Sequence, residues 1–466
     1  MAWPCRKTEE RMRLSELKPM VAGEMKGEDA EFNAVSIDTR TLKPGDLFIA
    51  ISGQRFDAHN FLSQAAEQGA CAAIVERWVD CSLPQVCVAD SRIALGQLGS
   101  AWRKHFAGQI VGLTGSNGKT TAKEMIAAIL SVNAKVLNTR GNLNNDFGVP
   151  LTLMGLTQEH RFGVIEMGAN HQGEIAYVAA LAKPDVALIT NAGEAHLEGF
   201  GSREGIAKGK GEIITALPPE GTAILNADDR FFGYWTELAG VRRVISFGFS
   251  EVADVRGFAD SVTVSWEGDS FKTRFSYAYL DRKHDIALNL AGRHNVANAL
   301  AAAATCLALG VAVEQIKEGL SRLVPVSGRI QPDRAANGAL LINDTYNANP
   351  SSFKAALEVL LEMPGQPWVA LGAFGELGET SAELHAELGK LALSLGVARL
   401  FATGPLADKA VEAFGPGAQY YPRQEELIVG LQSELKQDVA LLVKGSRSQH
   451  MERVIEALRN RVDLCC

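Results

Sequence analysis

The sequence predicts a three-domain α/β protein with a small mixed α/β N-terminal domain, a central domain built on a mainly parallel sheet, and a C-terminal domain with a Rossmann-like open sheet. The chain has 466 residues, and at roughly 150 residues per domain this length suits about three domains. In its central and C-terminal parts, apolar β-rich runs alternate with helical segments, which is typical of βαβ units. The pattern changes twice, so we expect domains at 14–106, 107–325 and 326–466.

Composition and charge exclude several classes of protein. Hydrophobic residues make up 47% and charged residues 21% of the chain, as in ordinary globular proteins. The net charge of −8 argues against a general nucleic-acid binder. No apolar run approaches the roughly 18 residues of a membrane span, the polar N-terminus is unlike a secretory signal, and the seven cysteines are scattered. We therefore expect a cytoplasmic protein without nucleic-acid partners or a membrane span. A monomer is the working expectation, although composition does not determine the oligomeric state.

The strand signals of the first two domains are short and apolar. Runs at 45–51 and 71–76 alternate with small helices in the N-terminal domain. The central domain opens with a strand at 109–113 that leads into a glycine-rich turn and a helix, and further strands follow at 162–167 and 186–190. This alternation of strand and helix predicts parallel order in the central sheet.

The later elements differ in pattern. Polar and apolar residues alternate in several runs between 241 and 290, which predicts an antiparallel side-sheet. The segment 295–309 is apolar nearly all round, which predicts a buried helix. From 326 onward, apolar strands alternate with helices at 351–362 and 382–395, so we expect a second open α/β sheet.

A phosphate-binding loop is the clearest functional signal. The segment 112–121, GLTGSNGKTT, follows an apolar strand and precedes a helix, which is the context a P-loop requires. Backbone N–H groups and the helix N-terminus favour phosphate there. Lys119 would bridge the β- and γ-phosphates and Thr120 would bind magnesium, although Leu113 stands at the first glycine position of the strict pattern. The alternative is a plain glycine-rich turn. The candidate ATP-binding residues here are Gly115, Ser116, Asn117, Gly118, Lys119, Thr120 and Thr121.

Glu166 ends the apolar strand at 162–167 and is followed closely by Gly168. Ligands of open α/β sheets bind at the carboxyl ends of the strands, and magnesium prefers oxygen ligands. Glu166 is therefore a candidate metal ligand facing the phosphate loop. Taken alone, it would be read as an ordinary acid at a strand end.

Lys210 lies at helical spacing from apolar residues. If residues 203–217 form a helix, Lys210 shares the stripe of Ile206, Ile213 and Ile214, whereas Lys208 points elsewhere. A lysine buried in such a stripe tends to lose its proton, and the neutral amine is reactive. The alternative is a lysine that extends its ammonium group to water.

From about residue 14 the whole chain resembles the Mur ligase family. The resemblance rests on several motifs in the family's order: TGSNGKT in the phosphate loop, GNLNNDFGVP (141–150), EMGANHQGEI (166–175), HLEGFGS (196–202), GRHNVANAL (292–300), NDTYNANP (343–350) and VKGSRS (443–448). It implies a P-loop ATPase-like central domain and ATP-dependent amide-bond formation in peptidoglycan synthesis. Within the family, GNLNNDFGVP and NDTYNANP most resemble the member that joins D-alanyl-D-alanine to UDP-N-acetylmuramoyl-tripeptide.

The resemblance implies roles for further residues of the ATP and metal site. Two magnesium ions would be bound by Thr120, Glu166, His196 and Lys210, the last as its carbamate with carbon dioxide. Asn295, beside His294, resembles the residue that meets adenine, although alone it would be the N-cap of a helix at 296–309. Arg329 resembles the arginine that reaches the γ-phosphate, and Asp344 a nucleotide-contacting aspartate.

The substrate residues are implied in the same way. Ser36, Thr39 and Arg40 resemble UDP contacts, or are turn and surface residues. The amides of the 141–150 motif suit the peptide, but asparagine is also common in turns. The dipeptide carboxylate would meet the segment 444–447, where a strand joins a helix. The remaining candidates are Asn142, Asn144, Asn145, Tyr346, Asn347, Lys444, Ser446 and Arg447.

One segment departs from the family pattern. Ala373 and Phe374 stand where the family usually has aspartate and methionine, whereas Glu376, Leu377, Gly378 and His385 are retained. Two alternatives stay open: another amino-acid ligase of the superfamily or a folylpolyglutamate synthetase, and a nucleotide-binding regulator that ligates nothing. The set of Lys119, Glu166, His196 and Lys210 argues against the regulator.

Overall fold

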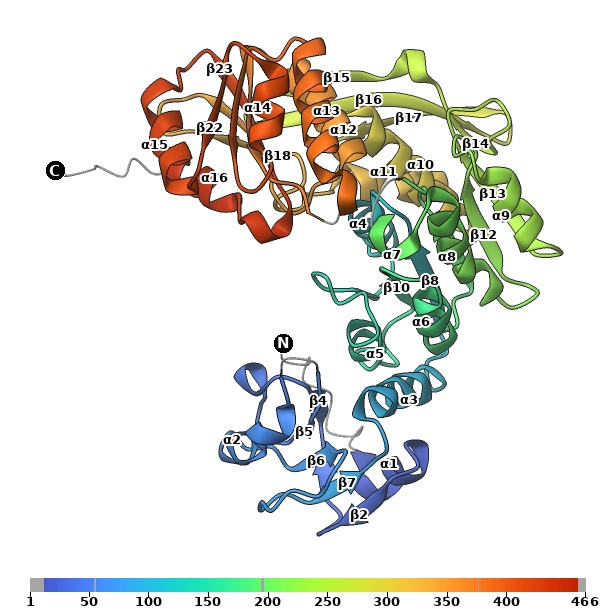
Figure 1. Cartoon of the computed structure of the whole chain (residues 1–466). Coiled ribbons are helices and arrows are strands. Elements are labelled where there is room, and N and C mark those ends of the chain that lie inside the picture. Colours follow the sequence, from blue (N-terminus) through green and yellow to red (C-terminus); the bar gives the residue numbers. More distant parts are fainter. Residues whose placement is uncertain (1–11, 54–55, 194–196, 376, 460–466) are drawn as a thin grey trace. The chain divides into compact units, whose positions relative to one another are not determined.

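The computed structural model describes residues 12–53, 56–193, 197–375 and 377–459. The chain divides into two compact units (Figure 1). The first comprises Met1–Gly112, Ala134–Ala169 and Gly173–Asp185, and the second comprises Leu113–Asn133, Asn170–Gln172 and Val186–Cys466. Strand β8 (Gln109–Thr114) passes from the first unit into the second and leads to the phosphate loop.

The first unit contains a five-stranded sheet in the order β2-β7-β6-β5-β4, in which only β2 runs antiparallel to its neighbour. Buried aliphatic side chains form a core on each face of this sheet. The predicted strands at 45–51 and 71–76 are β5 and β6. The elements are β1 (Met12–Arg13), α1 (Leu14–Met20), β2 (Glu24–Lys26), β3 (Glu31–Phe32), β4 (Ala34–Ser36), η1 (Thr39–Thr41), β5 (Asp46–Ile49), η2 (Ala58–Phe61), α2 (Leu62–Glu67), β6 (Ala72–Val75), β7 (Gln85–Cys87) and α3 (Ser91–Arg103).

Four further elements complete the first unit. Strands β9 and β10 pair in parallel, and β10 is the strand predicted at 162–167. Helix α3, given above, is capped by Asp90, whose side chain accepts hydrogen bonds from the N–H groups of Arg92 and Ile93. The bounds are β9 (Val136–Asn138), α5 (Gly148–Leu153), β10 (Phe162–Glu166) and α6 (Glu174–Ala182).

The second unit begins with helix α4 of the phosphate loop and continues with the parallel strands β11 to β14. Helix α10 has buried residues on nearly every face, as its sequence predicts. The elements are α4 (Lys119–Leu130), β11 (Val186–Ile189), α7 (Leu197–Phe200), α8 (Arg203–Thr215), β12 (Thr222–Asn226), α9 (Phe232–Ala239), β13 (Arg243–Gly248), β14 (Val255–Gly257), η3 (Ala259–Ser261), β15 (Thr263–Glu267), β16 (Ser270–Tyr279), β17 (Arg282–Leu288), α10 (Arg293–Ala308) and α11 (Val313–Ser321).

The antiparallel side-sheet is present as β15, β16 and β17. Two details differ from the expectation. The segment 243–248, expected within the antiparallel part, forms β13, which runs parallel to β12. The side-sheet is also continuous with the parallel strands, because β16 pairs with β14. Alternation of polar and apolar residues indicates that one face of a strand is exposed, but it does not determine whether the neighbouring strand is parallel or antiparallel.

The C-terminal part of the second unit is a six-stranded sheet in the order β18-β19-β23-β20-β21-β22, parallel except for β18. Separate hydrophobic cores cover its two faces, with α12 to α14 on one and α15 and α16 on the other. This is the predicted Rossmann-like open sheet. The elements are β18 (Gln331–Arg334), β19 (Leu340–Asp344), α12 (Pro350–Leu361), β20 (Gln366–Gly372), η4 (Gly378–Thr380), α13 (Ser381–Ser394), β21 (Arg399–Thr403), α14 (Asp408–Phe414), β22 (Ala418–Tyr421), α15 (Gln424–Glu434), β23 (Val439–Lys444), η5 (Arg447–Gln449) and α16 (Glu452–Arg459).

No helix within the described residues is long and apolar enough to cross a membrane.

Candidate nucleotide and ligation site

The phosphate loop has the backbone that its sequence predicts. Gly115 and Gly118 take positive φ angles of 152° and 81°, and Gly118 is the N-cap of α4. A Cβ at Gly115 would lie 1.8 Å from the Thr190 hydroxyl oxygen, and a Cβ at Gly118 would lie 2.2 Å from the Asn298 side-chain oxygen. Both positions therefore require glycine. The Lys119 ammonium donates to the Gly115 carbonyl at 2.6 Å, so it lies over the loop.

Residues after strand β11 hold the phosphate loop in this shape. The N–H of Ser116 donates to the Asn191 carbonyl at 3.0 Å, and the N–H of Asn117 donates to the Asn191 side-chain oxygen at 3.0 Å. The Thr190 hydroxyl donates to the Asn117 carbonyl at 2.7 Å. Asn191 is a functional candidate that the sequence analysis missed, because its only signal is a position at the end of a strand.

The C-terminal sheet domain also contacts the loop. The Asn349 amide donates to the Asn117 side-chain oxygen at 2.7 Å, and the Asn117 amide donates to the Ser351 hydroxyl at 2.9 Å. Arg329 donates to the Thr120 hydroxyl at 2.9 Å. Asn349 and Ser351 belong to the N-terminus of α12, and no sequence motif singled them out as site residues. These contacts connect the loop with residues more than two hundred positions away.

Lys210 lies in the predicted helix, α8, and is 1% exposed. Its nitrogen is 5.7 Å from the centroid of the Phe200 ring. Desolvation, and secondly the charge of Lys119, hold the pKa of Lys210 well below its usual value of 10.5. The alternative of a lysine extending to water is therefore wrong, whereas Lys208 is exposed as expected. A lysine in this setting gives up its proton more readily than one in water, and its neutral amine is a nucleophile.

Glu166 ends strand β10 in the first unit and is 2% exposed. Its Oε1 atom accepts a hydrogen bond from the Asn144 amide at 2.9 Å, and its backbone N–H donates to the Thr139 hydroxyl at 2.9 Å. Its Oε2 atom has no hydrogen-bond partner in the part of the chain that the structure describes. A buried carboxylate with one oxygen oriented and the other open suits a hard cation.

The asparagines of the 141–150 motif differ in setting. Asn144 is half-buried and orients Glu166. The Asn145 side chain accepts from the N–H of Gly148 at 3.0 Å, so it stabilises the turn before α5. Asn142 is exposed.

Asn295 is not an N-cap. Helix α10 begins at Arg293 with Gly292 as its N-cap, so Asn295 lies within the first turn. Its amide donates to the Ala291 carbonyl at 2.7 Å, and it is 5% exposed. The N-cap is Gly292, three residues before Asn295. Its φ angle of 93° is one that glycine adopts without strain. Burial lowers the pKa of the adjacent His294 to about 4.

Asp344 and Lys444 end the adjacent strands β19 and β23 and form a buried ion pair at 2.5 Å. The Lys444 ammonium also donates to the Asn347 carbonyl at 3.0 Å. The guanidinium of Arg329 lies 4.3 Å from the centroid of the Tyr346 ring. The structure thus brings together the predicted ATP residue Asp344 and the predicted dipeptide residue Lys444, which came from separate motifs.

The segment with Ala373 and Phe374, which departs from the family pattern, is anchored by His385. The His385 ring accepts from the N–H of Phe374 at 3.0 Å through Nε2, and its Nδ1 lies 2.6 Å from the Ser381 carbonyl. Burial holds the pKa of His385 below its usual value. The Ser446 hydroxyl accepts from the N–H of Gly375 at 2.7 Å. Ala373 and Phe374 are buried, so they fill core volume where the family pattern has a charge.

Two predicted residues lie outside the described residues, namely His196 and Glu376. Thr121 is buried, and Arg447 is mostly exposed and forms an ion pair with Glu452 at 3.0 Å.

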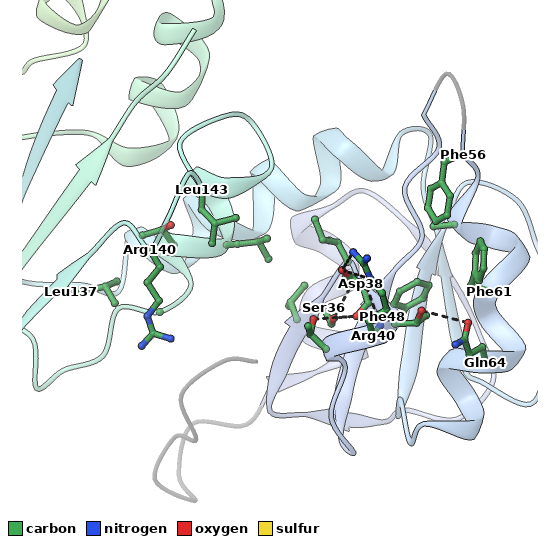
Figure 2. Close-up of a pocket in the computed structure, with 18 of the residues that line it drawn as sticks. Ser36, Asp38, Arg40, Phe48, Phe56, Phe61, Gln64, Leu137, Arg140 and Leu143 are labelled. Carbon is green, nitrogen blue, oxygen red and sulfur yellow. Dashed lines mark hydrogen bonds and ion pairs between the residues drawn. The ribbon is translucent and has the colours of Figure 1, made fainter. Parts of the chain in front are cut away.

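The first unit contains a cavity of about 840 Å³ (Figure 2). Ser36, Thr39 and Arg40 line it on the η1 side, together with Phe56 and Phe61, whose rings stack at 5.1 Å. Leu137, Arg140 and Leu143 line it from the segment around β9. The predicted UDP residues therefore share one cavity with aromatic side chains.

The fold and this site define an ATP-dependent ligase of the α/β class. Three family models match successive segments: "Mur ligase family, catalytic domain" over residues 31–98, "Mur ligase middle domain" over 113–306 and "Mur ligase, glutamate ligase domain" over 328–447. The chain belongs to the Mur ligase family.

Individual relatives match nearly end to end. The UDP-N-acetylmuramoyl-tripeptide–D-alanyl-D-alanine ligase of Escherichia coli is 44% identical over 96% of this chain and 98% of that one. A crystal structure of MurF from Acinetobacter baumannii is 39% identical, with a TM-score of 0.90 over 97% of this chain and 99% of that one. MurF ligase from Thermotoga maritima, solved in complex with ADP, is 30% identical, with a TM-score of 0.81 over 91% and 97% of the two chains.

Proposed function

We propose that this chain joins D-alanyl-D-alanine to UDP-N-acetylmuramoyl-tripeptide with the hydrolysis of ATP to ADP and phosphate, forming the UDP-linked muramoyl pentapeptide of peptidoglycan synthesis. The observation that carries the proposal is the end-to-end likeness to the Escherichia coli ligase. The phosphate loop, the buried Lys210 and the cavity near Arg40 agree with it in chemistry.

The proposed reaction has two steps. The terminal carboxylate of the tripeptide attacks the γ-phosphate of ATP, so that a new P–O bond forms, the bond to ADP breaks and an acyl phosphate results. The amino group of D-alanyl-D-alanine then attacks the acyl carbon, loses a proton and expels phosphate. Negative charge develops on the transferred group in the first step and on the acyl oxygen in the second.

Lys119 and Arg329 are the proposed cationic groups for the phosphates. In the structure their donors are used on the Gly115 carbonyl and the Thr120 hydroxyl. Lys119 also donates to the Ser116 carbonyl at 3.4 Å. All these acceptors are uncharged oxygens, and a charged phosphate oxygen accepts a stronger hydrogen bond than they do. Asn295 and Asp344 are proposed for the nucleoside, and the ion pair of Asp344 with Lys444 fixes the aspartate before the nucleotide binds.

Two magnesium ions are proposed, with Thr120, Glu166, His196 and carbamylated Lys210 as their protein ligands. The open Oε2 of Glu166 fits this assignment, and so does the burial of Lys210, which lowers the pKa of its amine. The amine would form an N–C bond to carbon dioxide and release a proton, which turns a buried base into an anion. The ions supply Lewis-acid neutralisation of phosphate charge.

The substrate ends are proposed as follows. Ser36, Thr39 and Arg40 line the cavity proposed for the UDP group. The residues proposed for the peptide are Asn142, Asn144 and Asn145. Tyr346, Asn347, Lys444 and Ser446 are offered to the incoming dipeptide. Boundaries at 14–106, 107–325 and 326–466, a cytoplasmic location and a monomeric state belong to the same proposal.

The deciding experiment measures phosphate release with ATP, magnesium, UDP-muramoyl tripeptide and D-alanyl-D-alanine, with mass spectrometry of the product. We expect release to require both substrates and to yield the UDP-linked pentapeptide. Parallel reactions with single amino acids, diaminopimelate or glutamate as acceptors test another ligase activity. Phosphate release with no amide product from any acceptor would contradict the proposal and favour a nucleotide-binding regulator.

A further inference from the structure

The cavity of the first unit contains an imbalance of charge that the sequence motifs did not reveal. Its lining includes three side chains that carry charge, Asp38, Arg40 and Arg140, among otherwise apolar and uncharged polar residues. Arg40, which the motif suggested for the UDP group, is bound to Asp38: its Nε lies 2.9 Å and 3.1 Å from the two carboxylate oxygens, and a terminal nitrogen lies 2.6 Å from one of them.

This ion pair is mutually stabilised. Its hydrogen bonds hold the pKa of the Asp38 carboxyl below its usual value and raise the pKa of Arg40. The carboxylate also accepts the backbone N–H of Arg40 at 3.0 Å. Arg40 therefore contributes almost no net positive charge to the cavity, and an anion that approached it would meet the negative charge of Asp38.

Arg140 is in the opposite situation. It lines the same cavity, and no acidic side chain pairs with it in the part of the chain that the structure describes. Figure 2 shows it near Leu143, on the chain between β9 and α5, whereas Asp38 and Arg40 belong to the segment around η1. The net charge of the cavity lining thus comes from Arg140.

The backbone that carries Arg140 is held firmly. The preceding residue, Thr139, is fully buried, donates its N–H to the Val164 carbonyl at 3.0 Å and accepts the N–H of Glu166 at 2.9 Å. The carbonyl of Arg140 accepts the N–H of Leu143 at 3.2 Å. A cation on such a base, next to the turn that orients Glu166, is well placed for a phosphate that enters the cavity.

We propose that Arg140 binds the diphosphate of the UDP-linked substrate and that Arg40 instead shapes the η1 turn through Asp38. The assignment rests on the proposed function, because it takes a UDP-linked substrate as the occupant of this cavity. A guanidinium can donate two parallel hydrogen bonds to a phosphate, which combines orientation with charge.

The test compares the binding of UDP with that of uridine by titration calorimetry, using the full chain. For Arg140→Ala we expect UDP to bind about tenfold to a hundredfold more weakly, with uridine binding unchanged. Arg140→Lys keeps the charge without the paired donors, so its affinity for UDP should lie between those of the wild type and Arg140→Ala. Arg161→Ala is the matched control, since Arg161 is exposed and outside the cavity lining, and it changes the net charge equally.

The outcomes separate this inference from the proposed function. If UDP and uridine keep their wild-type ratio of affinities in folded Arg140→Ala, or if Arg161→Ala weakens UDP equally, the assignment of Arg140 is wrong. Pentapeptide formation by the wild-type chain then still supports the ligase activity. If the wild-type chain binds UDP no better than uridine, the diphosphate contact itself is absent, whichever reaction the chain catalyses.

Discussion

At the scale of single residues, the burial of Lys210 determines both its chemistry and its effect on stability. Desolvation and the nearby Lys119 hold its pKa well below 10.5. Between that lowered value and 10.5, the unfolded chain binds a proton that the folded chain does not bind, so a falling pH favours unfolding. The amine therefore costs stability at neutral pH, and the cost disappears as the pH rises to 10.5.

Replacing Lys210 with methionine should separate stability from activity. In buffer free of carbon dioxide at pH 7, we expect Lys210→Met to raise the free energy of unfolding by about 1–3 kcal/mol, because folding no longer forces a buried amine to give up its proton. The gain should vanish toward pH 10.5, while ligation falls at least about a hundredfold. Urea denaturation at several pH values and the ligation assay measure these effects. A well-folded variant that is less stable than the wild type at pH 7 would contradict this reading.

Residue-scale prediction from the sequence succeeded where a local pattern carries the information. The spacing of Lys210 from Ile206 and Ile214 predicted its burial, because a helix repeats its faces every three to four residues. The same approach failed for Asn295, because Gly292 and not Asn295 is the N-cap of α10, and it gave no indication of Asn349 or Arg140. Their importance comes from contacts and charge balance between segments that are distant in the sequence.

At the scale of elements, the N-terminus of α12 has two roles. Asn349 caps the helix by accepting the N–H of Ser352, and it also donates to the phosphate-loop residue Asn117 at 2.7 Å. Ser352 completes the capping box through its hydroxyl and the N–H of Asn349. One residue thus joins helix stability to the shape of the phosphate loop.

Two cap variants should separate these roles. We expect Asn349→Ala to lower the free energy of unfolding by about 1 kcal/mol and to raise the KM for ATP roughly threefold to tenfold, since it also removes the bond to the loop. Ser352→Ala should lower stability without changing that KM. Thermal denaturation and steady-state kinetics provide the two readouts. An equal rise in KM for both variants would mean that helix stability alone controls ATP binding.

Close packing of α11 on the phosphate-loop helix gives a second prediction for elements. A Cβ at Gly319 would lie 2.3 Å from the Ile129 Cα, whereas one at Gly233 in α9 would meet nothing within 4 Å. We expect Gly319→Ala to lower the free energy of unfolding by about 1–3 kcal/mol or more, and Gly233→Ala to raise it by roughly 0.5–1 kcal/mol. Denaturation curves decide the matter, and similar effects for both would argue against the close approach.

The positions of helices and strands in the sequence were easier to predict than the pairing of the strands. The strands at 109–113, 162–167 and 186–190 are each apolar and flanked by helices, and all three are present. The parallel pairing of β13 and the continuation of the sheet into β16 were not predicted. Pairing depends on contacts between distant segments, and composition carries little of that information.

At the scale of the whole molecule, phosphate recognition works against the overall charge. The net charge of −8 repels anionic substrates at long range, so binding requires local cationic groups, for which Lys119, Arg329 and Arg140 are the proposed residues. Salt screens the long-range repulsion more than it screens close hydrogen-bonded contacts. Moderate salt should therefore weaken substrate binding less than a count of cationic contacts would suggest.

The order of the two proposed steps provides the last prediction, because an acyl phosphate formed first is open to any strong nucleophile. With ATP, magnesium, UDP-muramoyl tripeptide and hydroxylamine, but no dipeptide, we expect the tripeptide hydroxamate, detected by mass spectrometry. Omitting ATP should abolish it. Lys119→Ala should lower it at least about a hundredfold, because charge on the transferred phosphoryl group is no longer neutralised. If pentapeptide forms with the dipeptide while hydroxylamine never yields a hydroxamate, the amine must attack before a free acyl phosphate exists, and the two-step order is wrong.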